Sequence, residues 1–190
     1  MDNNFDFSSK SDEELVKDAL TNRDDFLYIV KRYKDKLFSY ARRISNVRFE
    51  EIDDLLQNIF IKVYLNLNDY NHDLKFSSWI YRIAHNEIID NYRKTKARPQ
   101  TIELNPEYDY LKNLKSEFNL IDEIDQKLSA DKITAIINSL EEKLKEIIFL
   151  RFFADKDYFE ISDILKIPAG TVASRLNKAK AELKKKLTKI

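Results

Sequence analysis

Cysteine is absent from the 190-residue chain, and the sequence contains only one Gly and three Pro. Without thiols the chain has no disulfide, no zinc–thiolate site and no cysteine nucleophile. A single glycine rules out the glycine-rich loops with which Walker and Rossmann proteins hold phosphate. Tight β-turns also depend on Gly and Pro, so an all-β sandwich is disfavoured.

The sequence also lacks long apolar runs and a set of metal ligands. No run approaches about 18 apolar residues, so no transmembrane helix is expected. The N-terminal stretch is acidic and has no apolar signal-peptide core, which predicts a cytoplasmic location. His72 and His85 are the only histidines, and neither has a partner at ligand spacing. We therefore expect no metal, no cofactor, no small-molecule substrate and no enzymatic activity.

Charged residues are abundant but segregated. They make up 35% of the chain and cancel, with 33 Lys+Arg against 33 Asp+Glu. Residues 175–190 nevertheless contain many lysines, with Glu182 as their only acidic residue. The charged residues between positions 75 and 98 are also mostly basic, whereas residues 50–54 read "EEIDD". Two basic zones beside acidic surface favour a protein that touches both DNA and another protein. The alternative is that each lysine run is a solvated helix face.

Helical periodicity predicts a first domain over residues 1–97. Apolar residues recur at helical spacing, and residues 68–75 form a polar loop. Ser11 and Glu14 have capping-box spacing at the first helix. The predicted helices are 11–21, 24–44, 49–67 and 77–97. They form one compact bundle.

Periodicity fades over residues 98–129, which we interpret as a flexible linker with a short helical piece at 117–127. A second domain, residues 130–190, follows. Four helices are predicted in it. The first covers residues 131–140, and the second begins with Ser139 and Glu142 as a capping box. The third covers residues 157–165, with Asp157 as N-cap and Glu160 three residues on, and the fourth covers residues 169–187. The last two, joined by the turn at 166–168, describe a helix-turn-helix. The predicted fold is all-α, with two small helical domains joined by the linker.

The last helix has two faces of different character at 100° per residue. Its core stripe consists of Val172, Leu176, Ala179 and Leu183. Its opposite face consists of Ser174, Asn177, Lys178 and Ala181. Short polar residues on the outer face suit entry into a DNA major groove, and Gly170 keeps the first turn slim beside phosphate. The alternative is an ordinary amphipathic helix with an accidental glycine.

Two quoted segments resemble one known family. "IPAGTVASRLNKAKAEL" resembles the C-terminal DNA-binding domain of extracytoplasmic-function (ECF) sigma factors. "DDLLQNIFIKVYLNL", followed by "FSSWIYRIAHNEIIDNYRK", resembles their N-terminal domain. The resemblance covers residues 12–96 and 130–187, and it implies a dissociable initiation subunit of bacterial RNA polymerase.

The resemblance implies specific partners for the first domain. The helix at 50–67 would dock on the clamp of the largest polymerase subunit through Asp54, Gln57 and Asn58, although the family usually has Glu in place of Asn58. The loop before "FSSW" would hold a flipped-out base of the −10 element, with Tyr70 or Phe76 stacking on it. The residues implied in −10 binding are Asn71, His72, Asp73, Lys75, Arg82, Asn86, Arg93 and Lys94. Trp79 is expected in the core.

The second domain would read the −35 element as duplex DNA. Base edges are assigned to Ser174, Asn177 and Lys178, and phosphates to Thr171 and Arg175. The family commonly has Lys or Arg where Ala173 stands. The family also implies contact with the polymerase flap and an anti-sigma factor that would hold the protein at the membrane. The competing hypotheses are a stand-alone helix-turn-helix regulator, which would bind its site without polymerase, and a helical adaptor that binds only protein.

Overall fold

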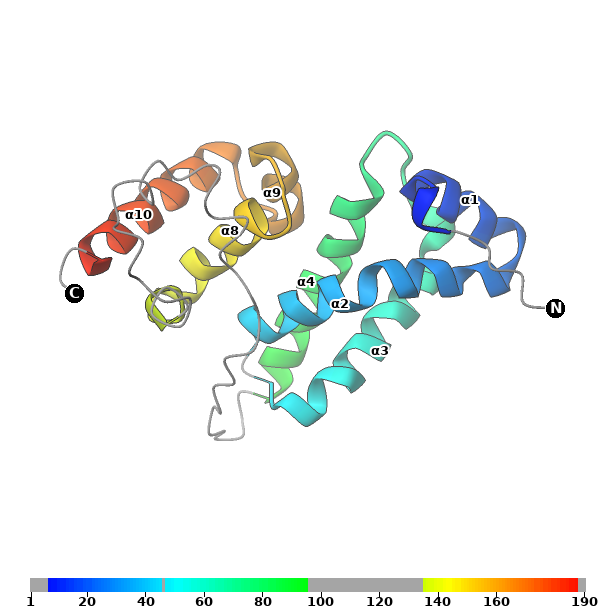
Figure 1. Ribbon diagram of the computed structural model, residues 1–190, viewed down its shortest axis with the longest axis horizontal. Coiled ribbons are helices and arrows are strands. Elements are labelled where there is room, and N and C mark those ends of the chain that lie inside the picture. The colour runs from blue at the N-terminus through cyan, green and yellow to red at the C-terminus, as the bar shows by residue number, and fades with distance from the viewer. Residues whose placement is uncertain (1–6, 46, 96–134, 188–190) are drawn as a thin grey trace. The chain divides into compact units, whose positions relative to one another are not determined.

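The computed structural model describes residues 7–45, 47–95 and 135–187 (Figure 1). Within these ranges every regular element is a helix, and the chain divides into two compact units, residues 1–100 and 101–190. The predicted all-α fold is confirmed. The predicted linker at 98–129, with its helical piece at 117–127, lies outside the described residues, and the exact domain boundaries stay predictions.

The first unit is a bundle in which α2, α3 and α4 pack against one another and α1 packs on α2 (Figure 1). Its elements are η1 (Phe7–Ser9), α1 (Asp12–Thr21), η2 (Arg23–Asp25), α2 (Phe26–Ile44), α3 (Phe49–Leu65), η3 (Leu67–Asp69) and α4 (Phe76–Thr95). The helices bury the residues that recur at helical spacing, including Ile29, Leu37, Ile59 and Ile80, each with an exposed fraction of zero. The bundle thus follows from the amphipathic pattern.

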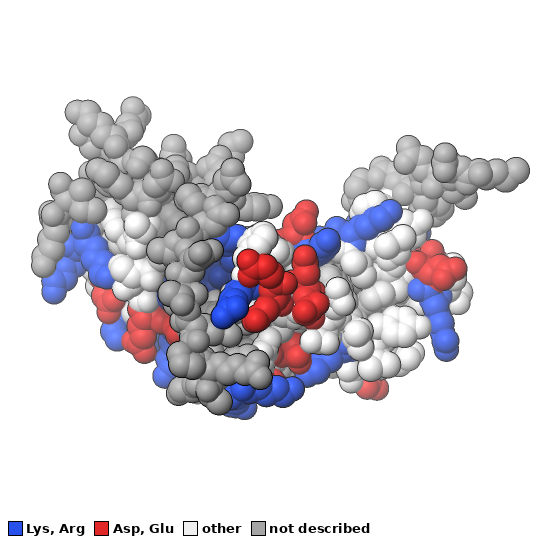
Figure 2. Space-filling model, turned by 90° about the horizontal axis from the view of Figure 1, so that it is seen from below, with Lys and Arg blue, Asp and Glu red and all other residues white. Residues whose placement is uncertain are grey.

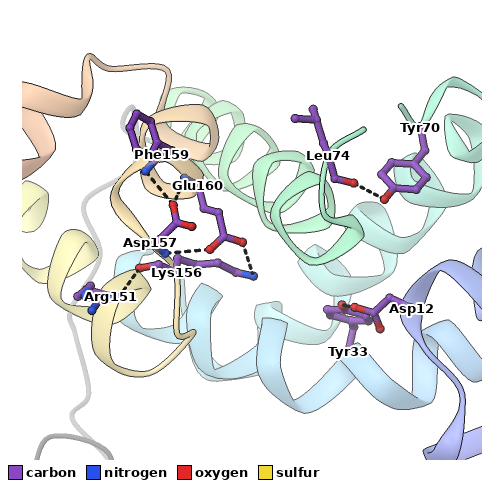
Figure 3. A network of polar contacts seen from close by, with 9 residues as sticks. All are labelled: Asp12, Tyr33, Tyr70, Leu74, Arg151, Lys156, Asp157, Phe159 and Glu160. Carbon is purple, nitrogen blue, oxygen red and sulfur yellow. Dashed lines mark hydrogen bonds and ion pairs between the residues drawn. The ribbon is translucent and has the colours of Figure 1, made fainter. Parts of the chain in front are cut away.

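Side chains near the start of α1 fasten it to α2. The predicted capping box is confirmed, since Ser11 Oγ accepts from the Glu14 N–H at 3.2 Å and Glu14 Oε2 accepts from the Ser11 N–H at 2.7 Å. Asp12 accepts a hydrogen bond from the Tyr33 hydroxyl at 2.5 Å (Figure 3). It also accepts one from Arg32 at 3.0 Å. Burial, reinforced by the Asp12 charge, raises the pKa of Tyr33 far above its usual value. Tyr33 therefore remains a neutral donor.

The second unit contains α8 (Glu142–Phe152), α9 (Tyr158–Leu165) and α10 (Ala169–Leu187), preceded by helical residues 135–138. The long helix α10 packs against both α8 and α9. The first part of the predicted helix at 131–140, residues 131–134, lies outside the described residues. The predicted turn and last helix agree with the structure, since α9 ends at Leu165 and α10 begins at Ala169.

The predicted capping box of Ser139 with Glu142 is wrong. The Ser139 hydroxyl donates to the Ile136 carbonyl at 2.7 Å instead. The N-cap of α8 is Glu141, and it makes no side-chain capping hydrogen bond. The Ser139 hydroxyl thus closes the preceding helical turn instead of capping α8.

The predicted capping box of α9 is confirmed and joins a buried ion pair (Figure 3). Asp157 Oδ1 accepts from the N–H groups of Phe159 and Glu160 at 2.9 Å each, and Glu160 Oε2 accepts from the Asp157 N–H at 2.9 Å. Glu160 Oε1 also lies 3.7 Å from Nζ of Lys156, which is 5% exposed. Arg151 donates to the Lys156 carbonyl at 3.2 Å. This network fixes the entry into the helix-turn-helix.

Candidate nucleic-acid interface

The two predicted faces of α10 are present in the structure. The core stripe of Val172, Leu176, Ala179 and Leu183 is buried. The opposite face of Ser174, Asn177, Lys178 and Ala181 is exposed. The core stripe packs α10 against α8 and α9, so most of the outer face remains exposed.

The turn before α10 is built by backbone geometry and one side chain. Lys166 adopts the left-handed conformation, with φ of 53°. The Ser162 hydroxyl donates to the Ile167 carbonyl at 2.6 Å, which ties the turn back to α9. The Pro168 carbonyl accepts the first N–H groups of α10, those of Thr171 at 2.8 Å and Val172 at 3.1 Å. These contacts orient the first turn of α10 relative to α9.

The fold of the chain does not require a glycine at position 170. Its φ is not positive, and a Cβ added there would have no atom within 4 Å. Neither backbone conformation nor internal packing selects glycine at this position. The first turn of α10 is consequently open on its outer side, as a close approach to DNA phosphate requires.

The predicted −35 residues differ in what they already contact. Thr171 and Arg175 are half-buried on the flanks of α10, and Asn177 is exposed. The Ser174 hydroxyl donates to the Thr171 carbonyl at 3.0 Å, which leaves its oxygen as an acceptor. Lys178 pairs with two carboxylates, which the sequence did not predict. Its Nζ lies 3.4 Å from Glu141 and 3.9 Å from Glu182.

In the first unit the predicted base-binding loop is exposed but ordered by its own contacts. Asn71, His72, Asp73 and Lys75 are all exposed. Asn71 Oδ1 accepts from the Asp73 N–H at 2.9 Å, and the Leu74 N–H donates to the Asn71 carbonyl at 3.1 Å. The loop thus presents polar side chains on a fixed backbone.

The prediction that Tyr70 or Phe76 stacks on an extruded base is wrong, because both rings are buried, with exposed fractions of 4% and 1%. Tyr70 packs against Phe76 and Trp79 at ring distances of 5.3 and 5.5 Å, and its hydroxyl donates to the Leu74 carbonyl (Figure 3). Burial raises the pKa of Tyr70, and the charges of Glu13 and Asp12 on α1 raise it further. These rings form the floor under the loop. Trp79 is in the core, as predicted.

His72 has the exposed ring of the loop. The sequence predicted His72 in this loop but gave its ring no stacking role. His72 is exposed and packs on the edge of Tyr70 at a ring distance of 4.9 Å. Of the rings of Tyr70, His72 and Phe76, that of His72 alone is exposed. It could therefore take the place of Tyr70 or Phe76 beside a base.

The residues of α4 predicted to bind DNA, three of them basic, form one stripe and one outlier. At 100° per residue, Arg82, Asn86 and Arg93 lie within about 40° of one another, whereas Lys94 lies about 100° farther round. Arg82 is half-buried and the other three are exposed. Arg93 lies 3.7 Å from Asp90, and both side chains are well exposed, so water screens this pair.

The predicted protein-docking residues lie on the outer face of α3. Asp54, Gln57 and Asn58 are exposed there, opposite the buried residues of the helix. The same stripe continues to Ile61 and Leu65, which are 55% and 68% exposed. On the side of the first unit that carries α3, Figure 2 shows acidic side chains beside a broad area without charge. The sequence analysis missed Ile61 and Leu65, although their spacing from Asp54 indicates the outer face.

No cluster of three or more His, Cys, Asp or Glu side chains suited to a metal ion occurs among the described residues. None of the helices in the described ranges is long and apolar enough to cross a membrane. The candidate functional surfaces are the exposed polar stripes on α3, α4 and α10 and the loop before α4.

Family models and relatives identify the class of protein that carries these surfaces. The model of Sigma-70 region 2 matches residues 29–98, and the model of Sigma-70, region 4 matches residues 130–183. The chain is thus a sigma factor of the sigma-70 type. The ECF RNA polymerase sigma factor SigW of Bacillus subtilis (strain 168) is 32% identical over 176 residues, covering 87% of this chain and 90% of that protein.

The ECF RNA polymerase sigma-E factor of Escherichia coli (strain K12) is 30% identical over 169 residues, covering 85% of this chain and 86% of that protein. The chain therefore belongs to the ECF sigma factors, and it is an alternative sigma factor that directs transcription initiation rather than a stand-alone regulator.

Two solved structures share the fold. The first is CnrH in complex with the cytosolic domain of CnrY, with a TM-score of 0.66, 21% identity, and coverage of 94% of this chain and 98% of that chain. The second is the sigma factor RpoE with the anti-sigma factor NepR from Bartonella quintana, with a TM-score of 0.65, 18% identity, and coverage of 87% and 98%. Both likenesses support the helical architecture described above.

Proposed function

We propose that the two units divide promoter recognition, the first docking on the polymerase clamp and binding the −10 element as a single strand, the second reading the −35 element as duplex. The observation that carries this proposal is the division of α10 into a buried stripe and an exposed polar face that begins at an open first turn. In this role the chain has no catalytic site of its own, since the polymerase performs the chemistry.

On the −35 side, each of the five predicted residues of α10 has a proposed contact suited to its chemistry. The Asn177 amide can pair with adenine N6 and N7, and Lys178 with guanine O6 or N7. Ser174 offers its hydroxyl oxygen as an acceptor to a base edge. Thr171 and Arg175, on the flanks of the helix, are placed for phosphates. The open turn at Gly170 lets the N-terminus of α10 approach a phosphate.

On the −10 side, the loop supplies hydrogen-bonding groups and the α4 stripe supplies positive charge. Asn71 uses its side-chain oxygen within the loop, so we expect its amide nitrogen to meet the extruded base. Asp73 accepts hydrogen bonds from base amino groups, and the exposed ring of His72 stacks. Lys75 lies at the loop end nearest α4. The remaining residues follow the DNA backbone: Arg82, Asn86, Arg93 and Lys94.

On the polymerase side, the outer face of α3 combines polar and apolar contacts. Asp54, Gln57 and Asn58 make the polar contacts with the clamp. Ile61 and Leu65 lose their exposure to water on docking, which stabilises the complex by about 1.5–3 kcal/mol for each side chain that becomes fully buried. The second unit contacts the flap. An anti-sigma factor, the kind of partner bound to the sigma factor RpoE in its structure, restrains the free protein.

Transcription by purified bacterial core polymerase, with and without this protein, on a library of genomic fragments tests the proposal. We expect discrete new 5′ ends that share two upstream elements. Asn177→Ala should lower initiation about tenfold at promoters with the preferred −35 base and relax that preference. The absence of new starts, together with tight duplex binding by the protein alone, would overturn the proposal.

Docking is tested separately with Asp54→Ala and a matched control. Asp54→Ala should weaken binding to core polymerase and lower initiation at all promoters alike. Asp53→Ala removes the same charge from the neighbouring exposed position, about 100° round α3, and should behave as the unaltered protein. Equal loss in both variants would show that α3 does not dock through the Asp54 stripe.

A further inference from the structure

The short segment between the helical residues 135–138 and α8 runs along one flank of α10 and reaches the edge of its outer face at Lys178. Lys186 Nζ donates to the Ser139 carbonyl at 3.1 Å and to the Ser139 hydroxyl at 2.5 Å. Two turns earlier on α10, Lys178 Nζ lies 3.4 Å from Glu141 Oε2. The segment is therefore joined to two basic side chains of the helix that is proposed to read DNA.

The core fixes the position of Glu141. It stands between Leu140, which is 4% exposed, and α8, whose Leu144 is 2% exposed. The Glu141 carbonyl accepts from the N–H groups of Leu144 at 2.8 Å and Lys145 at 3.0 Å. The backbone of Glu141 is held in this way, and its carboxylate lies beside Lys178 at the edge of the exposed face of α10.

Glu141 and promoter DNA require the same ammonium group. Lys178 belongs to the outer face of α10, where base edges and phosphates would offer it oxygen and nitrogen acceptors. A carboxylate paired with that ammonium must be displaced before DNA can use it. We propose that Glu141 competes with promoter DNA for Lys178, and so weakens −35 binding until the ion pair opens. This inference rests on the proposed function of α10.

Glu182 also lies near Lys178, at 3.9 Å, but its effect is different. It follows Lys178 by four residues on the same helix, the less favourable order for such a pair. Glu141 belongs to another element, so its pairing links the outer face of α10 to the entry of α8. The Lys178 and Glu141 side chains are 57% and 55% exposed. Water and salt screen such a pair, so its removal should change affinity by only about two- to fivefold.

The test measures promoter binding by polymerase holoenzyme assembled with the full chain, on a promoter found by the transcription experiment and on a copy with its −35 element replaced. The variants are Glu141→Gln, the double variant Glu141→Gln with Lys178→Gln, and Lys178→Gln alone. Glu142→Gln is the matched control, because it removes one charge from the adjacent exposed position. Thermal unfolding of each variant reports any change in folding.

Glu141→Gln should raise affinity for the intact promoter about two- to fivefold at low salt, and the gain should shrink as salt increases. The gain should disappear in the Lys178→Gln background and on the replaced −35 element. Equal effects of Glu141→Gln and Glu142→Gln, or a gain that persists without Lys178, would overturn the inference while leaving the sigma function intact. A holoenzyme that selects no promoter at all would overturn the proposed function and this inference with it.

Discussion

Replacing Glu160 by Gln should destabilise the second unit by about 3 kcal/mol, because it removes the charge that faces a buried ammonium. Lys156 Nζ lies 3.7 Å from Glu160 Oε1, and the two side chains are 6% and 11% exposed. Glutamine can still accept the hydrogen bond from the Asp157 N–H that completes the capping box of α9. The substitution therefore isolates the charge from the cap.

The magnitude follows from two opposing terms. At an effective dielectric constant of about 20, charges separated by the observed 3.7 Å attract by about 4 kcal/mol. Removing two charges from water offsets most of this gain, so the intact pair adds little net stability. Removal of one partner leaves the desolvation of the other unopposed, at about 3–5 kcal/mol. Lys156 has further interactions, which favours the lower end of that range.

The chain allows the two units to be followed separately. The only Trp is Trp79, in the core of the first unit, so its fluorescence follows that unit while circular dichroism follows both. A loss of about 3 kcal/mol should lower the melting temperature of the second unit by about 12–24 °C, with the fluorescence transition unchanged. Adding Lys156→Met should restore stability to within about 1 kcal/mol. A loss below about 1 kcal/mol, or no recovery in the double variant, would refute the reasoning.

Three further predictions concern the cap, the docking face and the buried tyrosines. Asp157→Ala should destabilise the second unit by about 1 kcal/mol, because two N–H groups in the first turn of α9 lose their acceptor. Asp157→Asn should retain most of the stability, and equal melting temperatures for the two variants would contradict this. Ile61→Glu should weaken binding to core polymerase about tenfold or more without lowering the melting temperature. Leu20→Glu, at an exposed position on α1, should leave this binding unchanged. Equal binding by the two variants would exclude Ile61 from the interface. Burial raises the pKa of Tyr33 and Tyr81, so the folded first unit keeps protons that the unfolded chain loses above about pH 10. Its stability should then fall by up to about 1.4 kcal/mol per pH unit for each tyrosine, with phenolate absorbance that stays low until unfolding; early ionisation of both rings in the folded protein would contradict this.

Local rules predicted the elements whose stabilising contacts are close in sequence. The capping boxes at Ser11 and Asp157 join residues three positions apart, so the residue types and their spacing were enough to predict them. The bounds of α10 were predictable because Pro168 precedes the helix and the buried stripe has a regular period. The same spacing rule failed at Ser139, where the carbonyl of Ile136 and a lysine 47 residues later in the chain bind the hydroxyl.

The parts of the candidate site that the sequence did not predict depend on distant packing. The loop before α4 was expected to expose an aromatic ring beside its polar residues. Tyr70 and Phe76 are buried instead, because Tyr33, far earlier in the chain, packs against Phe76 at 5.7 Å. Lys156 would be assigned to the surface by residue type, whereas the fold of the turn buries it beside Glu160.

The charge balance of the chain explains why promoter reading should depend on polymerase. Its 33 basic and 33 acidic residues cancel, and beyond a Debye length of about 10 Å at 0.1 M salt a DNA duplex experiences little net attraction. The proposed DNA contacts of the α4 stripe and of the outer face of α10 would act only at close range, and one lysine of α10 is already paired with Glu141. Docking through α3 would hold both reading surfaces near DNA and raise their effective concentration. A chain with weak long-range attraction gains most from such tethering, so the arrangement favours promoter selection by the holoenzyme over binding by the free protein.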